Sequence, residues 1–356
     1  MKSLNYILAF TLVSSTFISC KKDDDDETPV TTVSIQQIMD QFAAEVAFAS
    51  YNDLANATAD MHTHIQAFRT NPTASGLTQC KEDWKTVRQT WEQTESYLFG
   101  PAATENIDPR IDTWPVNFND LETIINSSDV LDATYINNLD DALKGFHPAE
   151  YLLYGLTGNK THVDFSAREL EFLEALSLNL KSLTQELANG WNPGAGSSFY
   201  HEFVTAGSGS STFPSEVSAF EEMVNAMAGI CDEVANGKIS EPFLAQDPTL
   251  EESPYSKNSL IDFTNNIKGV QNVYLCKYDS DGKGLEDLVR AHNFSLDGDI
   301  KLKISNAITS LNNISVPFGE AIITQPTQVQ NAIDAINELK TILEEELLPF
   351  VQLHVD

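Results

Sequence analysis

The 356-residue sequence has few basic side chains. It holds 21 Lys and Arg residues against 52 Asp and Glu residues, which gives a formal net charge of −31 at pH 7. Because phosphate contacts need clustered Lys and Arg, this balance argues against a nucleic-acid partner. With 42% apolar residues and 21% charged ones, the chain can still bury a core and does not have the composition of a disordered protein.

Cysteine is also scarce, with four residues in the chain. One of them, Cys20, belongs to an N-terminal processing pattern. The others, Cys80, Cys231 and Cys276, match no zinc-binding spacing, and their odd number allows at most one disulfide. We therefore predict buried free thiols at these three positions.

Several catalytic motifs are absent from the sequence: His-Glu-x-x-His, the Gly-x-Ser-x-Gly elbow, the phosphate-binding loop and the dinucleotide fingerprint. The segment 279–284 begins like a calcium loop. However, Lys283 and Arg290 stand where such a loop needs oxygen ligands, so we predict a turn there.

The N-terminus has the pattern of a targeting segment. Lys2 precedes an apolar run that ends at Ser19-Cys20, which predicts a lipoprotein signal peptide over 1–19 with Cys20 as the lipidated residue; an ordinary secretory signal is the alternative. Residues 20–33 are expected to form an acidic tether, which also resembles the export tags of surface lipoproteins. We therefore expect the protein in the cell envelope, lipid-anchored to the outer membrane, and on the cell surface if the tag operates.

The rest of the chain has helical periodicity. Apolar residues recur three and four apart over 35–46, 170–187, 217–227 and 329–342. The best strand candidate, 274–278, is short. These patterns predict an all-α protein of about ten helices, arranged as up-and-down bundles.

Local signals mark helix ends and a boundary. Ser166 and Glu169 have the spacing of a capping box, and Gly190 stands where a left-handed helix stop is expected. The Gly/Ser-rich stretch 207–211 is the best boundary candidate. It predicts a first bundle over 34–205 and a second over 206–356.

The segment 145–155 contains the most informative polar pair. His147 and Glu150 are three residues apart, so a helix places them on one face, where they can converge on one cation. Imidazole plus carboxylate suits zinc or iron, with further ligands from elsewhere; a structural hydrogen bond is the alternative. Pro148 disfavours helical geometry at His147, which predicts a kink or a new helix start there.

A second segment is dense in aromatic and charged residues. Trp84, Arg88, Trp91 and Glu95 share one helical stripe. The segment 106–115 follows, rich in charge and proline, and is predicted as a rigid loop held by an Arg–Asp pair.

Together these segments resemble the imelysin family of insulin-cleaving membrane proteases and iron-regulated bacterial lipoproteins. The family signature Gly-x-His-x-x-Glu, followed by an aromatic residue, two leucines, an aromatic residue and Gly, matches Gly145 to Gly155. The segments 84–101, 106–115, 232–242 and 253–266 are similar to the family in the same order. The resemblance covers nearly all of the expected mature chain.

The resemblance implies two bundles packed side by side, with the His-x-x-Glu site where they meet. It implies that His147 and Glu150 form the metal or active-site pair. Glu92, Glu95 and Asp112 are weaker metal-ligand candidates. The expected ligand-binding residues are Arg88, Ser256, Asn258, Ser259 and Asn266. Pro148 departs from the family pattern, where a small residue such as Ala is usual.

Three functions are compatible with these observations. The first is a binding protein that captures a divalent metal, iron or zinc, or an iron-containing ligand, for uptake with outer-membrane partners. The second is a metallopeptidase in which Glu150 acts as metal ligand or general base. The third is an interaction domain with a vestigial site. We favour the first, because the family has iron-linked members and the N-terminus carries envelope signals.

Overall fold

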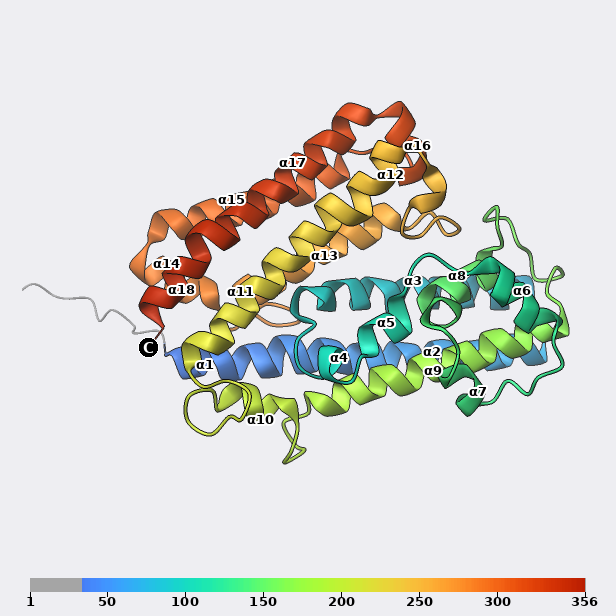
Figure 1. The fold of residues 1–356 in the computed structure, drawn as a ribbon, viewed down its shortest axis with the longest axis horizontal. Helices are drawn as coiled ribbons and strands as arrows, with labels where there is room; N and C mark the ends of the chain where they lie inside the picture. Colours follow the sequence, from blue (N-terminus) through green and yellow to red (C-terminus); the bar gives the residue numbers. More distant parts are fainter. Residues whose placement is uncertain (1–33, 356) are drawn as a thin grey trace, which may run out of the picture. The chain divides into compact units, whose positions relative to one another are not determined.

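Helices joined by loops make up residues 34–355, the part of the chain that the computed structural model describes (Figure 1). Within this part no strand forms, and Lys277 and Asp281 make one isolated bridge at the predicted turn. The all-α prediction is therefore confirmed, and the short segment 274–278 forms no strand, because its first two residues end a helix. The expected signal peptide, Cys20 and the tether lie outside the described residues and stay predictions.

The N-terminal helices are grouped around three long ones, α2, α3 and α9, which run side by side (Figure 1). Shorter helices connect them and cover their ends. The helices of this group are α1 (Ile35–Gln41), α2 (Ala49–Thr70), α3 (Ala74–Thr94), α4 (Pro101–Thr104), α5 (Ile107–Asp112), α6 (Phe118–Asn126), α7 (Ala133–Asn137), α8 (Phe146–Tyr154), α9 (Ala167–Gly190) and α10 (Phe199–Val204).

The C-terminal helices form a second group, in which α11, α13, α15 and α17 pack on one another. The groups meet where α13 lies against α3. The predicted boundary at 205/206 falls in the loop between α10 and α11 and stays a prediction. The helices of this group are α11 (Glu216–Asp232), α12 (Ser240–Ala245), α13 (Ser259–Leu275), α14 (Leu285–His292), α15 (Phe294–Asn312), α16 (Phe318–Thr324), α17 (Pro326–Ile342) and α18 (Leu348–His354).

Three long helices contain a wider π-type turn. These turns are η1 (Phe42–Phe48) between α1 and α2, η4 (Glu233–Ile239) between α11 and α12, and η6 (Leu343–Leu347) between α17 and α18. A π-type turn shifts the face on which the following residues lie, and such turns are frequent at functional sites. The turn η4 contributes to the polar cluster described below.

The helix-end predictions have mixed outcomes. Ser166 and Glu169 form the capping box at the start of α9, as predicted. The left-handed stop at Gly190 is wrong, because Gly190 is the last helical residue of α9. The absence of its side chain matters instead, since a Cβ there would lie 2.4 Å from Cγ of Pro101. The predicted loop 106–115 is also wrong in part, because Ile107–Asp112 forms the helix α5.

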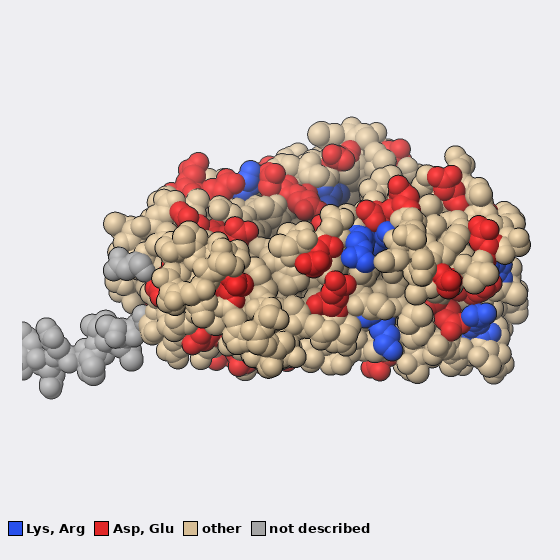
Figure 2. All heavy atoms as spheres, turned by 60° about the horizontal axis from the view of Figure 1, so that its bottom comes forward, with Lys and Arg blue, Asp and Glu red and all other residues tan. Residues whose placement is uncertain are grey.

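The three described cysteines, Cys80, Cys231 and Cys276, are free and buried, as predicted. Among the described helices, none is both long enough and apolar enough to cross a membrane. Figure 2 shows acidic side chains scattered over one face of the molecule, with the few basic side chains lying apart from one another.

Gly145 connects this fold to the polar cluster. It has a φ of 87° immediately before α8, and a Cβ at this position would lie 2.2 Å from the backbone oxygen of Ile111 in α5. We expect Gly145→Ala to lower the free energy of unfolding by about 2 kcal/mol or more, because it adds backbone strain and a backbone clash. Urea unfolding measures this change.

The matched control is Gly229→Ala in α11. Gly229 lies within this helix, and a Cβ added there would have no heavy atom within 4 Å. There we expect stabilisation by about 0.5–1 kcal/mol. Equal effects at the two glycines would contradict the assigned role of Gly145.

Candidate metal centre

His147 lies in the first turn of α8, which begins one residue earlier, at Phe146. The predicted new helix start is therefore confirmed. Pro148 occupies a first-turn position, where the missing N–H has no helical acceptor to lose. The His147 side chain is fully buried, and its ring lies beside that of Trp114, with centroids 5.1 Å apart.

Arg88 is the central cation of the polar cluster. It extends from α3, is fully buried, and pairs with both Glu92 and Asp112. Its Nη2 also lies 3.0 Å from Oε1 of Glu252, and its Nε lies 3.9 Å from Oδ1 of Asp262. Burial disfavours the charged guanidinium, but the surrounding carboxylates outweigh that effect and raise the pKa of Arg88 well above its usual value. Arg88 therefore organises carboxylates from α3, α5, α13 and the segment before α13.

Asp112, His147 and Glu252 offer three ligand atoms that all lie within 4.8 Å of one another. Nε2 of His147 is 3.1 Å from Oδ1 of Asp112 and 3.9 Å from Oε1 of Glu252. Trp91 donates a 2.6 Å hydrogen bond to the other oxygen of Asp112. Burial disfavours ionisation of Asp112, but Arg88 outweighs it and holds the pKa of this carboxyl well below its usual range. The group is therefore one imidazole between two carboxyl groups, one of which stays ionised.

The His147 ring is only partly satisfied by the protein. Its Nδ1 is buried with no hydrogen-bond partner, and its Nε2 has only the close approach of Asp112, at 3.1 Å and outside good hydrogen-bond geometry. Buried polar atoms without partners are uncommon and costly, so a ligand at the ring is expected on physical grounds. A mixed set of imidazole and carboxylate ligands fits Fe²⁺ or Zn²⁺.

Glu92, Glu95 and Asp112 form a second group of mutually close ligand atoms. Asn266 donates hydrogen bonds to Glu92 Oε2 at 2.7 Å and to Glu95 Oε2 at 2.5 Å. Lys238, from η4, lies 3.0 Å from the same oxygen of Glu95. Burial, reinforced by the neighbouring Glu92, raises the pKa of Glu95 well above its usual value. This side of the cluster therefore holds more carboxyl groups than it can keep ionised.

Glu150 faces a different set of partners from His147. Its Oε1 accepts hydrogen bonds from the backbone N–H groups of Tyr255 and Ser256 and from the Ser256 hydroxyl, at 3.1, 2.7 and 2.6 Å. Its Oε2 is buried without a partner. Burial raises the pKa of Glu150 to about 7, against the opposing effect of the Ser256 hydrogen bonds. The structure thus places His147, and not Glu150, in the three-ligand groups.

Asn258 and Ser259, two predicted ligand-binding residues at the start of α13, form hydrogen bonds with acidic side chains near the cluster. Asn258 donates to Asp262 at 2.7 Å. The hydroxyl of Ser259 donates to Glu251 at 2.8 Å and accepts from the backbone N–H of Ser253 at 3.0 Å. These contacts fix the segment that carries Glu252.

A cavity of about 370 Å³ opens onto the cluster. Its lining includes one basic side chain, Lys238, and six acidic ones: Glu95, Asp108, Asp112, Glu233, Glu241 and Glu252. Burial, with the nearby Asp112, raises the pKa of Asp108 to about 7. The cavity therefore gives a cation a route to the buried carboxylates.

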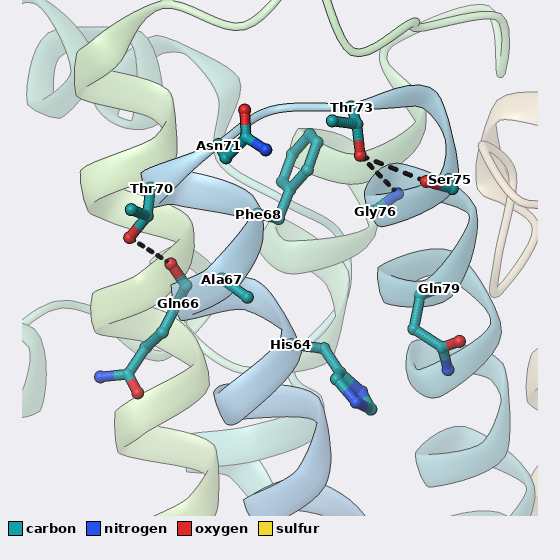
Figure 3. Close-up of a pocket in the computed structure, with 10 residues that line it drawn as sticks. All are labelled: His64, Gln66, Ala67, Phe68, Thr70, Asn71, Thr73, Ser75, Gly76 and Gln79. Atoms are coloured by element: carbon teal, nitrogen blue, oxygen red, sulfur yellow. Dashed lines mark hydrogen bonds between the residues drawn. The ribbon is translucent and has the colours of Figure 1, made fainter.

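A larger hollow of about 650 Å³ lies at the turn between α2 and α3 (Figure 3). Its lining is mostly uncharged, with His64 as its titratable side chain. Several of its groups already bond one another; Thr73, for example, accepts from the Gly76 N–H at 3.1 Å. Its size exceeds that of the cavity at the cluster, but it offers no comparable convergence of charge.

Sequence reasoning missed Glu252 and the role of Lys238. Glu252 lies beside another acidic residue in a segment without periodicity, which is typical of a solvated loop. Lys238 belongs to a segment similar to the family, but a Lys after Gly237 is typical of an exposed helix end. The family-like stretch 253–266 directly follows Glu252. It is the sequence signal that could have placed this region, at the start of α13, in the site.

Comparisons with known proteins cover almost the whole described chain. The family model described as Imelysin matches residues 47–345. Iron-regulated protein A of Synechococcus elongatus is 29% identical over 353 residues, which span 96% of this chain and 91% of the relative.

Two solved structures have the same architecture. One, assigned as an iron-regulated protein A precursor from Parabacteroides distasonis ATCC 8503, has a TM-score of 0.80 at 28% identity and covers 90% of this chain and 95% of its own. An imelysin-like protein from Psychrobacter arcticum 273-4 has a TM-score of 0.73 at 13% identity, with coverage of 90% and 96%, and shows the similarity of fold alone.

Proposed function

Because this chain belongs to the imelysin family, we propose that it binds a divalent metal ion, iron first, through Asp112, His147 and Glu252. The ion is cargo for uptake, held by a lipid-anchored protein of the outer membrane. The names of the relatives, which are iron-regulated proteins, support the choice of iron. The N-terminal sequence pattern supports the location.

One observation carries the proposal: the fully buried ring of His147, with no well-aligned hydrogen bond at either nitrogen, lies between the carboxyl groups of Asp112 and Glu252. The three residues come from α8, α5 and the segment before α13, so the fold itself brings them together. Imidazole and carboxylate are ligands of Fe²⁺, Zn²⁺ and Mn²⁺.

The cavity favours a hydrated cation over an anionic iron carrier. Six acidic side chains line it against one lysine. A chelate such as haem or ferric citrate carries carboxylates of its own, which this lining would repel. We therefore propose the aqua ion as the bound species.

The metallopeptidase alternative assigns Glu150 as metal ligand or general base. Its Oε1 already accepts three hydrogen bonds from Tyr255 and Ser256. This engagement supports a binding role for the cluster in preference to a catalytic one.

The test is metal binding by the purified full-length protein. We expect about one equivalent of Fe²⁺, measured anaerobically, or of Zn²⁺ for the wild type. His147→Ala should bind at least about 100-fold more weakly, because removal of a direct ligand costs no less than removal of an outer-shell partner. Calorimetry and elemental analysis measure affinity and stoichiometry.

His64→Ala is the matched control, because Nδ1 of His64 on α2 forms a 2.7 Å hydrogen bond with Asp83 on α3, away from the cluster. It should bind like the wild type. Retained affinity in folded His147→Ala would overturn the proposed site.

A further inference from the structure

We propose that the ammonium group of Lys238 occupies the place of a second divalent cation, so that the wild-type cluster takes one ion where its carboxylates could hold two. This inference rests on the proposed function above. It concerns the number of ions bound and the residue that sets it.

The surroundings of Lys238 are those of a multivalent cation. Its Nζ lies 3.0 Å from Glu95, 3.5 Å from Glu252, and 3.6 Å from both Glu92 and Glu233. An ammonium group has three N–H donors, so it cannot satisfy four carboxyl groups at once. A metal ion, which accepts four to six oxygen ligands, would use this arrangement more fully.

The carboxyl groups around Lys238 also form a ligand set. Ligand atoms of Glu92, Glu95 and Asp112 lie within 4.8 Å of one another, and Asp112 is shared with the His147 group. A carboxylate can bind cations through both of its oxygens, so Asp112 can bridge two neighbouring sites.

Asn266 supplies an independent sign of a ligand at this second group. It is fully buried, and its amide nitrogen contacts both Glu92 and Glu95. Its Oδ1 is buried without any hydrogen-bond partner. With a divalent ion in place of the ammonium group, rotation of the amide would turn this unpartnered oxygen toward the two carboxylates, where an amide oxygen is a suitable fourth ligand.

The position of Lys238 explains why it would exclude a second ion. The residue is carried by η4, lines the cavity, and has a side chain only 9% exposed. It therefore lies at the cavity, with its ammonium group beside Glu95 and near Glu92. Its fixed positive charge offsets the negative charge that a second divalent cation would need.

The experiment is a titration of the full-length protein with Zn²⁺ and, anaerobically, with Fe²⁺. We expect about one equivalent for the wild type and two for Lys238→Gln. In Lys238→Gln the first ion should also bind at least about tenfold more tightly than in the wild type, because a nearby positive charge has been removed. With Mn²⁺, the variant should give the spin-coupled paramagnetic resonance signal of two adjacent ions.

Further variants locate the second ion. Glu95→Gln in the Lys238→Gln background should return the stoichiometry to one. Lys238→Arg keeps the charge and should also bind one. Lys340→Gln removes a lysine that pairs with Asp232 at 2.8 Å on the surface, and it should match the wild type. Circular dichroism checks that each variant is folded, and Lys238→Met provides a second neutral replacement.

The outcomes separate this inference from the proposed function. One equivalent in every folded protein would overturn the inference and leave the proposed function standing. If the wild type bound no ion but Lys238→Gln bound one, metal binding by the native protein would be overturned. The proposal that the Lys238 ammonium group occupies a cation site would then be supported. None in any variant would overturn both.

Discussion

Replacement of Arg88 by Met is expected to lower the free energy of unfolding by about 3–5 kcal/mol, because it leaves buried carboxylates without their central counter-charge. Arg88 is fully buried, and it pairs with Glu92 and Asp112 and lies 3.0 Å from Glu252. Burial of unpaired carboxylates costs far more than the pairing itself contributes. Urea unfolding at pH 7 measures the difference.

The pH dependence of this loss has a defined sign. Arg88 holds the pKa of Asp112 well below its usual range. The associated stability is therefore fully present above the unfolded-state pKa of about 4 and is lost only as pH falls further. In Arg88→Met the buried carboxyl groups lose this counter-charge, so burial raises their pKa and they take up protons in the folded state. We therefore expect the Arg88→Met deficit to be smaller at pH 5 than at pH 7.

Arg69→Met is the matched control for Arg88. Arg69 pairs with Glu174 at 2.5 Å, but its side chain is 44% exposed. Exposed ion pairs contribute about 0–1 kcal/mol, so this variant should unfold nearly as the wild type does. A loss of less than 1 kcal/mol at Arg88 would contradict its assigned role.

Glu252→Gln is expected to weaken binding of Fe²⁺ or Zn²⁺ by at least about 100-fold, while Glu150→Gln weakens it less than about tenfold. Glu252 lies in a three-ligand group with His147, whereas Glu150 does not. An amide oxygen at position 150 can accept the three hydrogen bonds that Oε1 now accepts. The Glu150→Gln substitution also removes little negative charge, because burial raises the pKa of Glu150 to about 7.

Glu150→Ala distinguishes positioning from ligation. Without the acceptor, Tyr255 and Ser256 lose three hydrogen bonds, and the segment carrying Glu252 is released. We expect affinity to fall about 10- to 100-fold, as for outer-shell partners of metal ligands, and to be restored by Gln. If Gln and Ala were equally damaging, Glu150 would be a direct ligand and its assignment here would be wrong. Isothermal calorimetry on folded proteins measures each affinity.

Much of the fold follows from local signals in the chain. The capping box at Ser166 and the leucine spacing that follows it specify α9, and the apolar spacing over 329–342 falls within α17. The prediction at Gly190 fails because glycine serves two purposes in proteins, turning the chain and allowing close contact. Its closeness to Pro101 depends on tertiary packing, which no local pattern encodes.

The candidate site was less predictable than the fold. His147 and Asp112 come from segments whose residues already indicated chemistry. Helical spacing predicts that Glu150 and His147 share one face and one ligand, but the carboxylate of Glu150 instead accepts hydrogen bonds from the loop at Ser256. Glu252 and Lys238 become recognisable only when η4 and the approach to α13 fold against α3 and α5.

The location of the three proposed ligands also bears on how an ion would leave. Asp112 and His147 belong to the N-terminal helix group, and Glu252 belongs to the C-terminal one. An ion bound to all three acts as a cross-link between the groups, so its affinity and their association strengthen each other by the same free energy. By the same reciprocity, separation of the N-terminal and C-terminal helix groups would release the ion. A receptor that moved Glu252 away from His147 would lower the affinity for the ion without contacting the ion itself. Release of the ion would thus be controlled by the contact between the two helix groups.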